Sequence, residues 1–427
     1  MGPKDRILIL APHPDDEVLG CAGIVQKALN LKLPTKVVFL TNGDSNQWSF
    51  LVYRKFPVVM PKAVEKMGIL RCEEALAAAQ VLGLSPDHLV FLGYPDFGTL
   101  QIWHSRWHQR APLRSILTRK KAVPYKSAYR PGAAHKGEEI LQDLSTIIKD
   151  FRPTKIFVSH PVDYNGDHLA LYLFTLVALW DLKQEDHIEL NPYLIHYKGW
   201  PKLNDAHPQR LLEPPAPLKN QILWRSYRLD SSEIEKKQSA LKAHISQFRS
   251  NTQYLLSFVR SNELFGDFPP VKLKMSDDAN VFLHWEQNDH ILTAPAELTK
   301  KERSSFVGLE WRFVQLEGAS LVLSIHLSKP LAKDVQASVY IFGYRRDRSF
   351  GHMPKLHINL GIKKYAVYDQ TYALSGEMIE VVHLPRKITI RVSLKALGNP
   401  ERILAGARTY LGNVPLDLIP WRVLELV

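Results

Sequence analysis

The residues best suited to chemistry follow a short apolar run near the N-terminus, where the sequence reads ILILAPHPDDEVLG from residue 7. His13 stands between two prolines, and three consecutive acids, Asp15 to Glu17, come after it. One acid is enough to cap a helix through its free N–H groups and its macrodipole. Three acids and a histidine in one turn favour a metal site instead.

A catalytic zinc ion takes three protein ligands from His, Asp or Glu and leaves a fourth position for water. His13 and Asp16 can supply two ligands from one tight turn. We expect the third from His168 in SHPVDYNGDHLALY, because His168 opens a helix beyond another strand end. Asp15 is then free to take a proton from water whose acidity the zinc has raised. The pattern predicts metal-assisted hydrolysis of a carbonyl compound.

The elements around these residues alternate between strands and helices. Two runs are apolar on both faces, as in a buried parallel sheet, namely residues 6–10 and 35–44. Residues 88–96 and 154–161 are predicted as further strands. Three stretches have helical spacing: residues 18–29, 71–83 and 137–150. The alternation predicts a doubly wound, mostly parallel α/β sheet, in which ligands bind beyond the carboxyl ends of the strands.

The last third of the chain has a different pattern. Residues 320–327 and 387–394 alternate strictly between apolar and polar side chains, as half-buried antiparallel strands do. We therefore predict two domains, an α/β domain over 1–270 and an all-β sandwich over 271–427. Three tryptophans of the second domain either stack on sugar rings or belong to its core, and the core is favoured: Trp285, Trp311 and Trp421.

Composition narrows the choice of partners. The 427 residues carry a net charge of +12, which suits nucleic acid, a membrane surface or an acidic substrate. The two cysteines, Cys21 and Cys72, exclude a disulfide scaffold and a cysteine-rich metal site. The longest apolar stretch is about half of the roughly 20 residues that cross a bilayer, and no signal-peptide pattern is present. A soluble, cytoplasmic protein without a transmembrane segment is expected.

One long connection, residues 101–137, contains nine basic residues and no acid. Aromatic residues are interleaved with the basic ones. The segment is either a solvated basic insertion or a lid that recognises an anionic or sugar substrate. No nucleic-acid-binding motif accompanies it, so we do not expect a nucleic-acid partner.

These motifs resemble those of the LmbE-like (PIG-L) deacetylases. The first is the His13–Glu17 run after a first strand, together with the later Asp167-His168 pair. RCEEALAAAQVLGL followed by VFLGYPD, and the late KAHISQ, are also similar to elements of that family. The resemblance covers roughly residues 5–265. It implies a Rossmann-like zinc enzyme that removes acetyl groups from N-acetylglucosamine-containing compounds.

The resemblance also implies roles for individual residues. It makes His13, Asp16 and His168 the zinc ligands and Asp15 the general base. It places Arg71 and Asp96 at positions that hold sugar hydroxyls, although Arg71 could instead form a salt bridge with Glu74 or a neighbouring residue and Asp96 could start a turn. Asp167 is expected to orient a zinc-bound histidine, since metal-bound imidazoles usually need such a partner.

The sequence departs from the family pattern at one position. Many members carry His-x-Asp-His in the later motif, whereas this chain has Asn165 in place of the first histidine. An asparagine can donate a hydrogen bond to an oxyanion, but it cannot pass a proton to a leaving amine. Either Asp15 makes both proton transfers or another histidine helps, and three are available: His160, His196 and His244.

Together these features predict a zinc-dependent hydrolase that removes an N-acetyl group from an amino sugar or its conjugate. The basic connection favours a substrate that carries phosphate or carboxylate. Two alternatives stay open: a zinc amidase for a larger N-acyl conjugate, and a non-catalytic protein that binds a glycan or an anion. A dinucleotide-binding protein is disfavoured, because acids follow the first strand and no Gly-x-Gly-x-x-Gly is present.

Overall fold

The structure is a computed structural model that describes residues 1–44, 60–202, 205–274, 298–362, 364–374 and 378–427. Contacts between Cα atoms divide the chain into two compact units, Met1–Phe268 and Pro269–Val427. Each unit is described by itself below.

The N-terminal unit is built on a seven-stranded sheet with the order β3-β2-β1-β4-β5-β7-β6. The first five strands of this order pair in parallel, and β7 pairs antiparallel with both β5 and β6. The strand bounds are Ile7–Ala11 (β1), Thr35–Thr41 (β2), Leu89–Tyr94 (β3), Lys155–Ser159 (β4), Glu189–Tyr193 (β5), Trp224–Arg228 (β6) and Asn262–Gly266 (β7). This confirms the predicted mostly parallel α/β fold.

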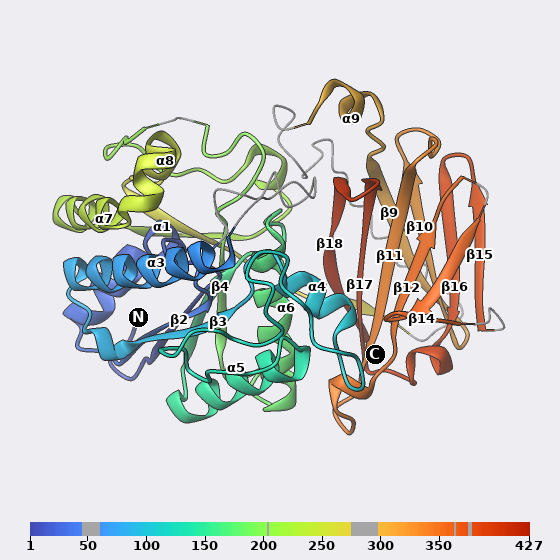
Figure 1. Ribbon diagram of the computed structural model, residues 1–427, viewed down its shortest axis with the longest axis horizontal. Coiled ribbons are helices and arrows are strands. Elements are labelled where there is room, and N and C mark those ends of the chain that lie inside the picture. The colour runs from blue at the N-terminus through green and yellow to red at the C-terminus, as the bar shows by residue number, and fades with distance from the viewer. Residues whose placement is uncertain (45–59, 203–204, 275–297, 363, 375–377) are drawn as a thin grey trace. The chain divides into compact units, whose positions relative to one another are not determined.

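Helices cover both faces of the sheet (Figure 1). One group comprises α1 (Asp16–Asn30), α3 (Pro61–Leu82), α7 (Ser231–Ala243) and α8 (Ile245–Leu256). The other group comprises α4 (Thr99–Ser105), α5 (Gly137–Phe151) and α6 (Gly166–Asp181). The helix α6 is apolar nearly all round, because it packs against both α4 and α5 as well as β4.

The order of the strands explains where a site forms. The chain leaves β1 toward β2 on one side, and it later returns to place β4 on the other side of β1. Neighbouring connections therefore diverge between β1 and β4, which leaves a crevice at the carboxyl ends of these two strands. The two clusters that the sequence singled out, after residues 11 and 159, meet at this point.

A buried ion pair fixes α1 behind the site. Lys237 Nζ on α7 lies 2.8 Å from Glu263 Oε1 on β7, and both side chains are 1% exposed. The Glu263 carboxylate also accepts hydrogen bonds from the backbone N–H groups of Gly23 and Ile24, and Lys237 donates to the carbonyl of Leu19. Because every polar atom of this pair has a partner, the pair holds α1 in place without leaving an uncompensated charge.

The long basic connection is packed against the unit rather than solvated throughout. Trp103, Trp107 and Tyr125 are buried, so their rings are part of the core and not a surface for sugar stacking. Arg130 forms ion pairs with Asp143 and Glu139 of α5. Most of the other basic side chains of the segment remain exposed. The finding favours a structural insertion over a lid.

The C-terminal unit consists of two sheets, with the orders β15-β16-β10-β9 and β14-β13-β12-β11-β17-β18-β8. All pairs are antiparallel except β18 with β8. Apolar side chains from both sheets form one shared core, which confirms the predicted all-β architecture. The bounds are Val271–Leu273 (β8), Leu309–Glu317 (β9), Ser320–Leu327 (β10), Val335–Tyr344 (β11), Lys355–Leu360 (β12), Tyr365–Asp369 (β13), Tyr372–Ala373 (β14), Ile379–Leu384 (β15), Lys387–Ser393 (β16), Arg402–Leu411 (β17), Val414–Leu426 (β18) and Lys300–Ser304 (α9).

Of the three tryptophans considered above, the structure places the side chain of one. Trp421 is 2% exposed and packs edge-on against Phe342, with a ring-centroid distance of 4.9 Å. It is a core residue, as favoured. Trp285 and the side chain of Trp311 lie outside what the structure describes. Across the described residues, no helix combines the length and the apolarity that a bilayer crossing requires.

Burial of His135 in the basic connection predicts an acid-labile contribution to stability. Burial lowers the pKa of His135 to about 4, from 6.5. The unfolded chain therefore binds the proton first as the pH falls, so this contribution is complete above pH 6.5 and is lost down to about pH 4. We expect acidification from pH 7 to pH 4.5 to destabilise the native protein by about 2–3 kcal/mol more than a His135→Gln variant.

Denaturant unfolding at the two pH values measures this difference. His187→Gln is the matched control, because His187 is exposed. The prediction is wrong if His135→Gln and His187→Gln lose stability in parallel with the native protein.

Candidate metal centre

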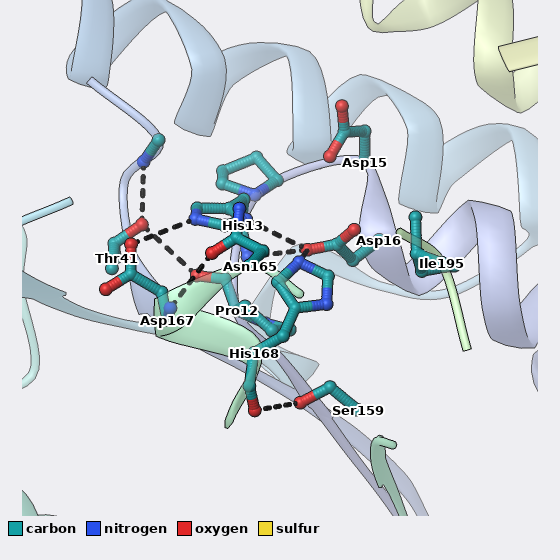
Figure 2. Close-up of polar contacts among 12 residues, drawn as sticks. Pro12, His13, Asp15, Asp16, Thr41, Ser159, Asn165, Asp167, His168 and Ile195 are labelled. Carbon is teal, nitrogen blue, oxygen red and sulfur yellow. Dashed lines mark hydrogen bonds and ion pairs between the residues drawn. The ribbon is translucent and has the colours of Figure 1, made fainter. Parts of the chain in front are cut away.

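The site begins in the turn between β1 and α1. Asp15 is the residue that precedes α1, yet its side chain makes no capping hydrogen bond. Its backbone adopts φ 121°, a conformation that non-glycine residues rarely take and that costs of order 1–3 kcal/mol. The simple capping explanation for these acids is therefore not supported. The strained turn instead points the side chains of Asp15 and Asp16 in different directions (Figure 2).

Three buried side chains from the two clusters converge as the sequence predicts. Asp16 Oδ2 lies 3.1 Å from His13 Nδ1 and 3.1 Å from His168 Nε2. Figure 2 shows the Asp16 carboxylate between the two imidazole rings. One donor atom from each residue lies within 4.8 Å of the others. Ligands bound at 2.0–2.2 Å to a tetrahedral ion are about 3.4 Å apart, so this donor set fits a divalent metal ion such as zinc.

The electrostatics of the three residues also suit a cation. Burial opposes ionisation of Asp16, but His168 and His13 hold its pKa well below the ordinary value. Burial lowers the pKa of His168, whereas Asp16 and Asp163 raise it, and the result is about 9. The carboxylates thus stabilise positive charge at the position where the two rings meet.

Asp163 supports His168 and was missed by the sequence analysis. His168 Nδ1 lies 3.0 Å from Asp163 Oδ2, and both side chains are fully buried. Asp163 also accepts hydrogen bonds from the backbone N–H groups of Ile195 and His196. This is the arrangement in which a carboxylate fixes the tautomer and orientation of a metal-bound imidazole. The acid in HPVD was a visible signal, because it follows the same strand end as His168.

Asp96 and Asp167 face the opposite side of His13. His13 Nε2 lies 3.2 Å from Asp96 Oδ1 and 3.4 Å from Asp167 Oδ2. Asp167 additionally accepts hydrogen bonds from Thr99 and from the backbone N–H of Phe97, at the start of α4. The expected contact of Asp167 with a ligand histidine is present in this geometry. Asp96, expected to hold a sugar hydroxyl, lies instead against His13.

Arg71 and Glu17 hold Asp15 from two sides. Arg71 Nη2 lies 3.3 Å from Asp15 Oδ1, and the guanidinium also donates to the carbonyls of Gly43 and Pro14. The backbone N–H of Asp15 donates to Glu17 Oε2 at 2.8 Å. Arg71 is 1% exposed, so much of its hydrogen-bonding capacity is used within the protein.

Two residues of KAHISQ, His244 and Ser246, bind acidic side chains near the turn between β1 and α1. His244 Nε2 lies 3.0 Å from Glu17 Oε1, and the His244 side chain is fully buried. Ser246 donates its backbone N–H and its hydroxyl to Glu74 on α3, which explains why Glu74 does not pair with Arg71. The late segment therefore acts on the metal turn through a chain of contacts from α8 and α3.

A small cavity adjoins two of the three converging residues, His13 and Asp16. Its volume is about 60 Å³, and residues from four segments of the chain line it: His13, Asp15, Asp16, Leu19, Arg71, His196, Gln247, Asn251, Tyr254 and Leu255. Burial raises the pKa of Asp15 to about 6, with Arg71 lowering it and Asp16 raising it. A carboxyl with this pKa ionises near neutral pH and can also hold a proton.

The position expected to replace the missing histidine has a local structural role. Asn165 precedes α6, and its Oδ1 caps the helix by accepting from the backbone N–H of Asp167 at 2.9 Å. Asn165 is not among the described residues that line the small cavity. The oxyanion contact expected of Asn165 from the sequence therefore stays a prediction.

The structure separates the three histidines that could assist. His160 stacks on Trp224, and His244 lies behind the turn against Glu17. His196 alone of the three lines the small cavity, with its ring 4.7 Å from the His168 ring and its Nδ1 3.3 Å from the Tyr254 hydroxyl. Burial lowers the pKa of His196 to about 4, so the ring is neutral at neutral pH.

Fold and site together define an α/β protein with a buried His-Asp-His cluster at the switch point of its parallel sheet. Residues 8–179 match the PIG-L family model, described as GlcNAc-PI de-N-acetylase, and this segment is therefore a PIG-L family domain. The match includes β1 to β4 and nearly all of α6. It ends before KAHISQ, so that part of the resemblance rests on sequence alone. No curated protein matches the chain significantly.

Several solved structures resemble the chain at low identity. The N,N'-diacetylchitobiose deacetylase from Pyrococcus horikoshii is 16% identical, with a TM-score of 0.37 over 61% of this chain and 82% of that one. The A40926 pseudoaglycone deacetylase Dbv21 is 17% identical, with a TM-score of 0.39 over 62% and 96%. The 4-carboxy-2-hydroxymuconate hydratase GalB from Pseudomonas putida KT2440 is 17% identical, with a TM-score of 0.33 over 62% and 98%. Likenesses this distant assign no activity.

Proposed function

We propose that the protein is a zinc-dependent N-deacetylase that acts on an N-acetylated amino sugar or its conjugate. The observation that carries the proposal is the convergence of His13, Asp16 and His168, with Asp15 lining a small cavity beside His13 and Asp16. The match of this segment to a de-N-acetylase family model supports it. When bound, the zinc ion supplies a Lewis acid that polarises the amide carbonyl and raises the acidity of water.

The residues of the chain divide the remaining tasks. Asp15 takes the proton from the attacking water and, because burial has raised its pKa, can deliver that proton to the departing amine. Arg71 and Glu17 keep Asp15 in its strained conformation. His196 and Tyr254 bound the cavity and orient the amide. In this assignment Asp15 makes both proton transfers, so the histidine that Asn165 replaces is not needed.

The size of the small cavity favours acetyl over a larger acyl group. A cavity that encloses a drug-sized ligand measures roughly 300–1,000 Å³, far more than this cavity. The small volume of this cavity suits an acetyl group, and the sugar of a conjugate can remain outside. The observation therefore favours the deacetylase over the amidase for larger acyl groups.

Asp15→Asn tests the deacetylase directly. We expect zinc-loaded protein to release amine from N-acetylglucosamine, N,N'-diacetylchitobiose or a phosphorylated derivative, and the variant to be slower by about 10²–10⁴-fold with zinc still bound. Removal of zinc by a chelator should abolish release by the native protein. Asp87→Asn, a change at an exposed carboxylate, should have no effect.

A non-catalytic binding protein would behave differently. In that case, neither the native protein nor the variants would release amine, although the sugars would bind to both Asp15 forms. That result, with one zinc ion bound, would replace the proposed activity with binding.

Asp163→Asn tests the support of the metal ligand. We expect zinc affinity to fall by about 10–100-fold, because the amide neither fixes the His168 tautomer as well nor supplies its charge. Competition with a chromophoric chelator measures the change. Asp150→Asn on the exposed end of α5 serves as the control. Unchanged affinity in Asp163→Asn would show that His168 does not bind zinc through Nε2.

His196→Asn distinguishes the two routes for the second proton. If Asp15 makes both transfers, the variant should lose about tenfold or less in kcat and keep the acid limb of its pH–rate profile. A loss as large as that in Asp15→Asn, together with a changed profile, would instead identify His196 as the proton donor. Tyr254→Phe removes the hydroxyl beside His196 and should give a smaller loss.

A further inference from the structure

A second and larger cavity lies in the N-terminal unit, outside the site described above. Its volume is about 730 Å³, within the range of cavities that enclose ligands of several rings. Its walls come from residues 200–202, residues between 209 and 219, Arg228 on β6 and Arg260 after α8. We call it the basic cavity.

The charges that line the basic cavity are strongly unbalanced. One carboxylate, Glu213, is present among its lining residues, against five cations: Lys202, Arg210, Lys219, Arg228 and Arg260. Arg260 is only 2% exposed, and both burial and the nearby Arg210 lower its pKa. An anion in this cavity would offset the repulsion between these cations, and partial desolvation would strengthen the attraction.

The walls are well ordered by internal hydrogen bonds. The Trp200 indole donates to the carbonyl of Glu213 at 2.7 Å, and the backbone N–H of Leu212 donates to Asn262 on β7. The backbone N–H of Ser261 donates to the carbonyl of Arg210 at 3.0 Å. Trp200, Leu212 and neighbouring prolines add apolar surface to the cavity. Such a mixture suits a charged ligand that also has a ring or another apolar face.

Packed rings connect this cavity with the small one. His196 stacks on Tyr254 in the small cavity, and Tyr254 packs against Phe258 at 5.5 Å. Phe258 in turn packs against Trp200 at 5.5 Å, in the wall of the basic cavity. The same two chain segments thus form a wall of each cavity. In the proposed function the acetyl group enters the small cavity, and the remainder of the conjugate lies outside it.

We propose that the basic cavity binds the anionic part of a sugar conjugate whose acetamido group enters the small cavity. The proposal rests on the proposed function for the link between the two cavities, but binding of the anionic group does not depend on turnover. It assigns anion recognition to the residues that line the basic cavity and not to the basic connection 101–137, none of whose residues lines either cavity among the described residues.

Calorimetry on zinc-loaded Asp15→Asn protein tests the proposal without hydrolysis of the probe. The probes are N,N'-diacetylchitobiose 6-phosphate and neutral N,N'-diacetylchitobiose. We expect the phosphorylated sugar to bind about tenfold more tightly at low salt, with an advantage that shrinks as salt is added. The double change Lys219→Gln and Arg228→Gln should remove most of this advantage and leave the affinity for the neutral sugar unchanged.

The control replaces two exposed lysines elsewhere in the unit, Lys126→Gln and Lys149→Gln, which changes the net charge equally. The control should keep the advantage of the phosphorylated sugar. Arg260→Gln should reduce the advantage of the phosphorylated sugar further. Arg260 is buried, so if Arg260→Gln prevents folding, the test rests on the double change at the exposed residues Lys219 and Arg228. Equal affinity for the two sugars, or an equal loss in the control, would overturn the proposal.

The test of anion binding in the basic cavity can succeed or fail independently of the test of the proposed deacetylase activity. Absence of amine release from every acetylated sugar by the native protein would contradict the deacetylase. A charge-dependent affinity that requires Lys219 and Arg228 would still establish the basic cavity. Conversely, a deacetylase with equal affinity for both probes would retain its function and lose this site.

Discussion

The structure depends on a concentration of buried negative charge at one end of the sheet. Six carboxylates are at most 7% exposed around the rings of His13 and His168: Asp15, Asp16, Glu17, Asp96, Asp163 and Asp167. Charges removed from water are strongly unfavourable unless cations and hydrogen bonds compensate for them. Arg71 and His244 compensate at one side, and a divalent ion between Asp16 and the two histidines would compensate at the other.

The strained turn is the second consequence of this arrangement. Asp15 and Asp16 are adjacent in sequence, but their side chains point in different directions. Asp16 lies against His13 and His168, whereas Asp15 lies against Arg71. The positive φ of Asp15 separates their directions, and hydrogen bonds to Glu17 and Arg71 sustain it. Glu17 relies on His244, and α1 as a whole relies on the Lys237–Glu263 pair. Residues after 230 therefore help to hold a turn near the N-terminus.

The two proposals concern two cavities of different kinds. The small cavity is lined by Asp15 together with His13 and Asp16, and its volume is about 60 Å³. The basic cavity is larger, and its positive charges come from four exposed side chains and one buried arginine. The net charge of +12 suggested an anionic partner, and five of the cations line the basic cavity.

The sequence by itself determined the local features. Apolar runs defined β1 to β4, helical spacing defined α1 and α5, and the His13–Glu17 run with His168 gave the converging residues, because these signals lie within a few neighbouring positions. Tertiary structure decided what depends on distant contacts: the pairing of His168 with Asp163, the capping role of Asn165, and the placement of His196 beside Asp15. A side chain's partner across a sheet leaves no periodic trace in the sequence, since only the packed fold brings the two together.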